Sequence, residues 1–332
     1  MTGAPGRILV RLPNWLGDVV MSRPCVRALR AAHPQAELRA VVPGALLPIA
    51  EWDGVFDRLH AWPAGRGACE ALARELRAWR PDAALVLPPS FSSAWWALRC
   101  HAPARIGYRG EARDALLTRG LRRPPRGDRH LAEEYLELAA MLGARRVPEV
   151  PLPVPEPARE AASALRAHHG IPETYAVLGP GAAYGPAKRW APERFAAVGR
   201  ALAARGLAVL ACGADAERAE CVGVAEAIGA RGVSLAGATE LTTLAALCAA
   251  ARIAVCNDSG LAHLSAATGT ATLVVFGSTS SAWTAPLGAR VRVVQHAPVC
   301  SPCFQRTCRI GYRCLAAVSA AEVIAACEAL AA

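Results

Sequence analysis

Lys188 is the only lysine in a chain of 332 residues whose other 36 basic residues are arginines. It follows the glycine-rich stretch Gly179-Pro180-Gly181-Ala182-Ala183-Tyr184-Gly185, and Arg189 comes directly after it. Glycine lets a backbone approach a ligand closely, and adjacent cations attract a diphosphate. The spacing differs from that of a P-loop, and no Ser or Thr follows the lysine. The segment is therefore either a diphosphate-binding loop or a solvated basic turn.

A second polar loop follows the apolar run at residues 253–255 and reads Asn257-Asp258-Ser259-Gly260-Leu261-Ala262-His263. Its first three residues can all cap a helix, and Gly260 lets a ligand come close to the helix N-terminus, which attracts anions. Gly277-Ser278-Thr279 forms a similar small polar loop after the run at residues 272–276. Together these loops predict a nucleotide-diphosphate pocket, although His263 alone would more often be a core histidine.

A carboxylate follows the first apolar run, in Leu12-Pro13-Asn14-Trp15-Leu16-Gly17-Asp18. Asn14, the proline and the glycine suit a tight turn from a strand into a helix, which places Asp18 near the helix N-terminus. The residue is then either a helix N-cap or a general base that takes a proton from an acceptor hydroxyl.

Residues 105–129 hold eight arginines against Glu111, Asp114 and Asp128, a local charge of +5. This segment is either a solvated basic surface or a cradle for an anionic acceptor, and we assign acceptor binding to Asn14, Arg105, Arg109 and Arg113. Nucleic acid is a weaker candidate and is not expected as a partner, because Tyr108 is the only aromatic residue nearby and no nucleic-acid-binding motif accompanies the segment.

Four of the twelve cysteines are clustered, at Cys300, Cys303, Cys308 and Cys314. Only the first spacing is typical of structural zinc, and no second CxxC or HxxxH follows. The cluster is thus a structural zinc site or, as we favour, a redox-sensitive or packed loop. The other eight cysteines lie among apolar residues and are expected to be reduced core residues.

The elements that must position these loops alternate between strand and helix. Strands are predicted at residues 7–11, 38–42, 83–87, 175–178, 208–211, 253–255 and 272–276, and helices at residues 19–32, 135–142, 192–204, 216–228 and 241–250. Such alternation predicts α/β architecture with parallel sheets covered on both faces. The proline-rich stretch at residues 147–157 suggests a boundary, so we predict a domain at residues 1–150, a linker region at 151–170 and a second domain at 171–332.

The net charge of +10 indicates anionic partners. No run of about 20 apolar residues is present, and the N-terminus lacks the features of a secretory signal, so a cytoplasmic protein is expected. No GxGxxG fingerprint follows any predicted strand, which argues against a nicotinamide or flavin enzyme. No cofactor is therefore expected.

Seven motifs occur in order along nearly the whole chain, and together they resemble glycosyltransferase family 9, most of all the heptosyltransferase II group. They are LPNWLGDVVMSRP, LVLPPSFSSA, RIGYRGEAR, GPAKRW, NDSGLAHLSAATGT, VVFGSTSSAWTAP and CSPCFQRTCRIGYRC. The sequence departs from the commoner family spelling at Leu261-Ala262, where Pro-Met is frequent, and at Gly277-Ser278-Thr279-Ser280, which replaces Gly-Pro-Thr-Asp. The second departure removes a carboxylate, so no role is carried over to Ser280.

The resemblance implies a GT-B fold, with two Rossmann-like domains whose parallel sheets face each other across a cleft. It implies inverting, metal-independent transfer of L-glycero-D-manno-heptose from ADP-heptose to the inner core of lipopolysaccharide. Asp18 would be the general base and Lys188 would neutralise the leaving ADP. The donor site would comprise Gly181, Arg189, Glu217, Asp258, Ser259, Gly260, Leu261 and His263. Peripheral contact with the anionic inner face of the inner membrane is also expected.

Three alternatives stay open. The chain could be a heptosyltransferase I or III, or a related transferase that uses another nucleotide sugar. It could be a non-catalytic basic binding protein of GT-B fold, although the presence of both Asp18 and Lys188 argues against this. It could also be a nucleotide-sugar epimerase of similar fold, which the arginine-rich N-terminal half fits less well than a large acidic acceptor.

Overall fold

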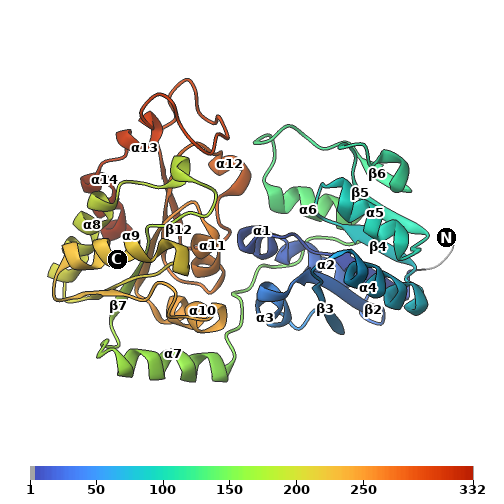
Figure 1. The fold of residues 1–332 in the computed structure, drawn as a ribbon, viewed down its shortest axis with the longest axis horizontal. Coiled ribbons are helices and arrows are strands. Elements are labelled where there is room, and N and C mark those ends of the chain that lie inside the picture. The colour runs from blue at the N-terminus through green and yellow to red at the C-terminus, as the bar shows by residue number, and fades with distance from the viewer. Residues whose placement is uncertain (1–3, 332) are drawn as a thin grey trace. The chain divides into compact units, whose positions relative to one another are not determined.

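The computed structural model describes residues 4–331, which divide into two compact units between Val150 and Pro151 (Figure 1). Each unit has its own parallel sheet and its own hydrophobic core. None of the helices within these residues is both long and apolar enough to cross a bilayer.

The N-terminal unit contains a six-stranded parallel sheet in the order β3-β2-β1-β4-β5-β6. Its strands are β1 (Arg7–Arg11), β2 (Glu37–Pro43), β3 (Arg58–Trp62), β4 (Ala83–Val86), β5 (Ala104–Tyr108) and β6 (Arg119–Leu121). The central strands are apolar on both sides, because helices cover both faces of the sheet (Figure 1). This is the doubly wound order, in which the direction of strand addition reverses between β1 and β4.

The helices of this unit are α1 (Leu16–Met21), α2 (Arg23–Ala32), α3 (Leu47–Glu51), α4 (Arg66–Trp79), α5 (Phe91–Arg99) and α6 (Leu131–Ala140). Short 3₁₀ turns lie at Gly44–Leu46 and Asp114–Leu116. Local sequence sets several ends: the Ser90 hydroxyl accepts the backbone N–H of Ser93 at the start of α5, and Arg80 adopts a left-handed conformation after α4.

One predicted helix is divided in two. The prediction of a single helix at residues 19–32 was wrong, because α1 ends at Met21 and α2 begins at Arg23. Pro24 has no N–H to continue the hydrogen bonds of α1, and a proline is tolerated in the first turn of a new helix. The Ser22 hydroxyl donates to the carbonyl of Val19, which satisfies the end of α1.

The C-terminal unit repeats the same strand order in its own sheet, β12-β11-β10-β7-β8-β9. Its strands are β7 (Tyr175–Gly179), β8 (Ala208–Ala211), β9 (Gly232–Ser234), β10 (Ile253–Asn257), β11 (Thr272–Phe276) and β12 (Val291–Gln295). The reversal lies between β7 and β10, which are buried along their whole length.

The helices of this unit are α7 (Glu156–His168), α8 (Pro192–Ala204), α9 (Arg218–Ile228), α10 (Leu241–Ala250), α11 (Gly260–Ala267), α12 (Ser281–Thr284), α13 (Arg313–Ala317) and α14 (Ala320–Ala331). Short 3₁₀ turns lie at Pro186–Lys188 and Asp215–Glu217. A large core cluster lies between the sheet and α8, α9 and α14, with Trp190 and Phe195 among its fully buried members.

The region predicted as a linker, residues 151–170, is mostly helical. It contains α7, which packs against α10 through a face that buries Ala158 and Ala162. Pro157 occupies the first turn of α7, where its missing N–H costs no helical hydrogen bond. The proline-rich composition therefore indicates the start of a helix of the C-terminal unit as well as a boundary.

Candidate functional site

The strand order of the C-terminal unit brings three polar loops to one place. Gly179 at the end of β7 is level with Cys256 of β10, and Asn257 is level with Val275 of β11. The loops after β7, β10 and β11 therefore leave the sheet side by side at its carboxyl edge, next to the reversal between β7 and β10. Ligands of doubly wound sheets bind at this position.

Lys188, Asp258 and Thr279 meet at this edge, one from each loop. The Lys188 ammonium lies 2.6 Å from Asp258 Oδ2, and the Thr279 hydroxyl donates to the same oxygen at 2.6 Å. The Asp258 side chain is 2% exposed and that of Lys188 is 14% exposed. The sequence placed Lys188 and Asp258 in one pocket, but it assigned no role to Thr279, whose only signal was its position after β11.

Asn257 holds the glycine-rich loop at both ends. Its side-chain oxygen accepts the backbone N–H of Trp190 at 3.0 Å, and its amide nitrogen donates to the carbonyl of Pro180. Trp190 is fully buried, and its indole nitrogen donates to the carbonyl of Val318 at 3.0 Å. Asn257, the last residue of β10, therefore holds the loop that carries Lys188 through two hydrogen bonds. Ser259 is the N-cap residue of α11.

Gly181 makes room for Glu217. A Cβ atom at Gly181 would lie 2.2 Å from the Glu217 carboxyl carbon, so only glycine allows this packing. The Glu217 carboxylate also accepts the backbone N–H of Ala214 at 2.9 Å. The two residues predicted to bind the donor are therefore in direct contact with each other, beyond the ends of β7 and β8.

Arg189 and the residues at the start of α11, which were also predicted to bind the donor, each have a different environment. Arg189 donates to the carbonyl of Ala182 at 3.2 Å and lies 3.9 Å from a carboxylate oxygen of Glu220. Burial is the main cause that raises the pKa of Glu220. Leu261 packs against Gly179, where a Cβ atom would come within 2.8 Å of it. Ser259 and Gly260 begin α11 directly after Asp258, where the helix N-terminus carries partial positive charge.

His263, also predicted to bind the donor, lies within α11. Its residue is 3% exposed, and it lies within α11 with buried residues on both sides in sequence. Because Asp258 at the same edge is equally buried, low exposure does not distinguish a donor-binding histidine from a core histidine, and both stay predictions.

In the N-terminal unit, the loop before Asp18 is held by a buried arginine. Arg11 lies over the Trp62 ring with its guanidinium carbon 4.1 Å from the centroid, and it donates to the Asn14 side-chain oxygen and to the carbonyl of Val41. Burial lowers the pKa of Arg11 to about 10. Asn14, predicted to bind the acceptor, is exposed at the surface while its side-chain oxygen is held by this arginine.

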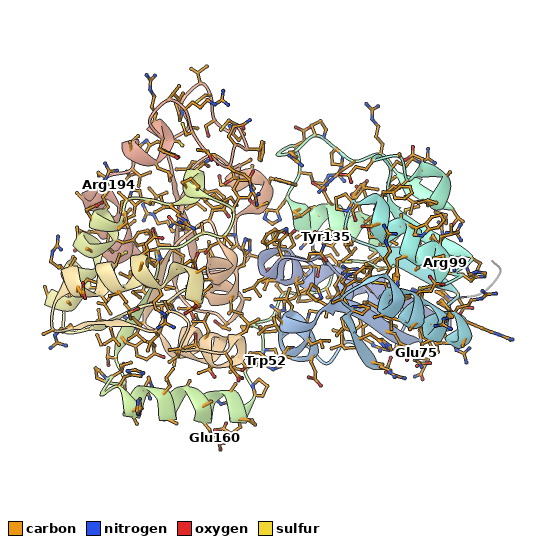
Figure 2. The ribbon with its side chains drawn as sticks, in the orientation of Figure 1. Trp52, Glu75, Arg99, Tyr135, Glu160 and Arg194 are labelled. Atoms are coloured by element: carbon orange, nitrogen blue, oxygen red, sulfur yellow. The ribbon has the colours of Figure 1, made fainter. Side chains whose placement is uncertain are left out.

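Asp18 lies in the first turn of α1 and is half-buried, but it is not the N-cap. That position belongs to Trp15, which makes no side-chain cap hydrogen bond. The interpretation of Asp18 as only a helix cap is therefore wrong. Tyr135 on α6 lies in the interior of the unit (Figure 2), and its pKa is raised by burial and then by the nearby Asp18 carboxylate. Asp18 therefore lies near α6, against which α1 packs.

Two of the three arginines predicted to bind the acceptor, Arg105 and Arg113, donate hydrogen bonds to backbone carbonyls of the N-terminal unit. Arg113 is 0% exposed and donates to the carbonyls of Tyr108 at 2.7 Å and Pro88 at 2.6 Å. Arg105 is half-buried and donates to the carbonyls of Leu116 at 2.7 Å and Ala102 at 2.6 Å. Burial lowers the pKa of Arg113 to about 10. Because Arg113 is fully buried, the prediction that it contacts the acceptor is corrected. Arg109, by contrast, is exposed.

The four clustered cysteines lie in the loop at residues 300–314. Within residues 4–331, no group of three or more His, Cys, Asp or Glu side chains is placed to hold a metal ion. Cys308 Sγ instead accepts the backbone N–H groups of Ile310 at 3.4 Å and Tyr312 at 3.3 Å, and burial raises the pKa of Cys314. These contacts are those of a packed loop, and the assignment of the cluster as structural zinc or as a redox-sensitive or packed loop stays a prediction.

Comparison with known proteins places these features in one family. The chain matches the family described as Glycosyltransferase family 9 (heptosyltransferase) over residues 69–313. It is 31% identical to lipopolysaccharide heptosyltransferase 2 of Salmonella typhimurium, over 87% of this chain and 88% of the relative. Among solved structures, it is similar to that of E. coli ADP-heptose lps heptosyltransferase II, with a TM-score of 0.84, 28% identity and 98% of each chain covered. A glycosyl transferase family 9 structure from Veillonella parvula shares the fold, with a TM-score of 0.91, 24% identity, and 100% of this chain and 98% of the other covered.

Proposed function

Because the chain belongs to glycosyltransferase family 9 and is therefore a glycosyltransferase, we propose that it transfers L-glycero-D-manno-heptose from ADP-heptose to the inner core of lipopolysaccharide. The proposal is carried by one observation, the convergence of Lys188, Asp258 and Thr279 at the reversal point of the C-terminal sheet. The similarity to heptosyltransferase 2 proteins over most of the chain supports the choice of heptose and acceptor.

The donor is assigned to the C-terminal unit. Glu217 accepts a hydrogen bond from the adenosine ribose, and Gly181 keeps the loop close to it. The diphosphate lies at the loop that carries Lys188 and Arg189, near the N-terminus of α11 at Ser259 and Gly260. Lys188 is already paired with Asp258, so its ammonium must be shared between that carboxylate and the diphosphate when the donor binds. Asp258 and Leu261 then contact the sugar.

In the reaction, Asp18 takes the proton of the acceptor hydroxyl as the acceptor oxygen attacks the anomeric carbon. The bond between that carbon and the β-phosphate oxygen breaks, and ADP leaves with an added negative charge. Attack opposite the leaving group inverts the anomeric centre. Fixed positive charge at the departing phosphate stabilises the transition state electrostatically, with Lys188 and the helix N-terminus as its sources.

The acceptor is assigned to the N-terminal unit, with Asn14 and Arg109 as its surface contacts. This unit holds 22 of the 37 basic and 15 of the 27 acidic residues, which gives it a formal charge of +7. That charge suits a phosphorylated core and peripheral contact with the anionic inner face of the inner membrane.

The test is to incubate the protein with a panel of nucleotide sugars and heptose-deficient core and to measure release of the nucleoside diphosphate. We expect ADP release that requires both ADP-heptose and core, and that persists in excess EDTA. Release from another nucleotide sugar would assign a different donor. Loss of activity in EDTA that Mg²⁺ restores would contradict the metal-independent mechanism.

A further inference from the structure

Residues 300–314, called here the cysteine-rich loop, form part of the wall of the donor site. The backbone N–H of Ala187 donates to the carbonyl of Arg306 at 3.1 Å, and the backbone N–H of Phe304 donates to the carbonyl of Ser278 at 2.8 Å. The Ser278 hydroxyl donates to the carbonyl of Gln305 at 3.0 Å. Residues 304–306 are therefore bound to both the loop that carries Lys188 and the loop that carries Thr279.

Tyr184 is the centre of this junction. Its ring lies under two cations, with the Lys188 ammonium 4.9 Å and the Arg306 guanidinium carbon 5.4 Å from the ring centroid. Both distances fall within the range of cation–π attraction. The Tyr184 hydroxyl donates to the carbonyl of Phe304 at 2.5 Å, which fixes the ring against the cysteine-rich loop.

Gly185 allows the two loops to approach so closely. A Cβ atom there would lie 2.8 Å from the Arg306 carbonyl oxygen, and the residue has a φ of 143°. Both the contact and the backbone conformation require glycine. The position of Arg306 beside Tyr184 is therefore determined by backbone contacts on both sides.

We propose that Arg306 is a further donor-binding residue, a second cation for the diphosphate of the nucleotide sugar, with Tyr184 as the positioning residue for both Arg306 and Lys188. The inference rests on the proposed function. The charge of Lys188 is largely offset by Asp258, so Lys188 alone adds little net positive charge. Arg306 is exposed, and the structure pairs it with none of the carboxylates in residues 4–331. A guanidinium also presents two parallel N–H groups that match phosphate oxygens.

The first experiment compares Arg306→Ala with Arg309→Ala, a matched control on the same loop. Arg309 is also exposed, but it is not one of the two cations that lie over the Tyr184 ring. We expect Arg306→Ala to weaken ADP binding by about tenfold, the loss typical of one charge-assisted hydrogen bond, and to lower kcat/KM for ADP-heptose similarly. Adenosine binding, which lacks the phosphates, should stay the same in both variants, and Arg306→Lys should recover part of the loss.

The second experiment uses the single lysine as a probe. Reductive ¹³C-methylation labels Lys188 and the N-terminal amine, and it preserves the positive charge of the lysine. In the wild-type protein, the methyl signal of Lys188 should show the ring-current shift of a group that lies over Tyr184. Tyr184→Phe, which keeps the ring, should keep that shift, whereas Tyr184→Leu should lose it and bind ADP more weakly.

The outcomes separate the two proposals. If the wild type binds ADP and transfers heptose while Arg306→Ala matches Arg309→Ala in ADP binding and kcat/KM, the role of Arg306 is overturned and the proposed function stands. A ring-current shift that is the same in Tyr184→Leu overturns the positioning role of Tyr184. If the wild type neither binds ADP nor releases it from ADP-heptose, the proposed function fails and the inference fails with it.

Discussion

The two units have the same strand order but hold the loops near the reversal point with different side chains. In the N-terminal unit, Arg11 and Arg113 are buried, and their guanidinium groups donate to backbone carbonyls that hold the loops after β1, β4 and β5. In the C-terminal unit, Asn257 and the buried Trp190 hold the corresponding loop. The C-terminal unit thus leaves Lys188 and Arg306 at the edge of its sheet.

If the donor binds the C-terminal unit as proposed, net charge does not locate the anion site. The N-terminal unit carries +7 of the total charge of +10, but part of it is buried, and further arginines are paired, as Arg123 is with Glu134 at 2.8 Å. The C-terminal unit carries only +3, and two of its cations, Lys188 and Arg306, lie over one tyrosine at the carboxyl edge. At that edge Lys188 lies 2.6 Å from Asp258, whereas the structure pairs Arg306 with none of the carboxylates in residues 4–331.

The largest effect is expected from Asp18→Asn. This change removes the only group that we assign as a general base, and general-base catalysis contributes about 10²–10⁴-fold. Heptose transfer should fall by at least that factor while calorimetry finds ADP binding unchanged, because the donor binds the other unit. Asp128→Asn, a change of an exposed carboxylate in the same unit, should leave transfer unaffected. Transfer by Asp18→Asn within about tenfold of wild type would contradict the assignment.

The next largest effect is expected from Lys188→Met. This substitution leaves the Asp258 carboxylate buried without its cation, so the free energy of unfolding should fall by about 3 kcal/mol and transfer should fall by about 10²-fold or more. Denaturant titration and steady-state kinetics measure the two effects separately.

The double variant Lys188→Met/Asp258→Leu serves as the control for this pair. Removing both charges should recover most of the lost stability but none of the activity. Recovery of activity in the double variant would show that the pair only supports the fold.

The alternation of strands and helices, and therefore the doubly wound fold, could be predicted from the sequence because buried central strands are continuous apolar runs. Strands β1, β8 and β11 begin and end as predicted. The strands that were missed lie away from the reversal point and mix polar with apolar residues, as in β3 (RLHAW) and β12 (VRVVQ). Such strands lack the apolar signal because one face or one edge is less buried.

The sequence was enough to predict which loops form the candidate site, but not which side chains of those loops contact one another. Each polar loop could be placed after a strand, since parallel strands direct their carboxyl ends to one edge. Which side chains then meet depends on backbone far away in sequence: Arg113 is buried only because carbonyls of Pro88 and Tyr108 surround it. Composition alone could not distinguish that arginine from exposed Arg109.

That distinction gives a third prediction, with a smaller effect on activity. Arg113→Glu should lower the free energy of unfolding by about 3 kcal/mol, because it places a carboxylate among carbonyl oxygens without a donor. Arg109→Glu should leave stability within about 0.5 kcal/mol of wild type, as is usual for surface substitutions. It should instead raise KM for the core acceptor about tenfold, with an effect that high salt reduces. Equal acceptor kinetics for Arg109→Glu and wild type at low salt would mean that the basic segment is only a solvated surface.

The smallest effect is expected from Gly181→Ala, which tests how closely the C-terminal loops must approach. The added Cβ atom would lie 2.2 Å from the Glu217 carboxyl carbon, so the carboxylate must move and its hydrogen bond to the Ala214 N–H must weaken. Because we assign Glu217 to the adenosine ribose, ADP and adenosine binding should both weaken by about threefold to tenfold, the loss expected for one hydrogen bond. Gly223→Ala is the matched control in α9: no atom lies within 4 Å of its added Cβ atom, and alanine favours a helix by about 1 kcal/mol. That control should bind both ligands normally and unfold at an equal or higher denaturant concentration. If Gly181→Ala loses affinity for ADP but not for adenosine, Gly181 instead serves the diphosphate, and Glu217 does not hold the ribose.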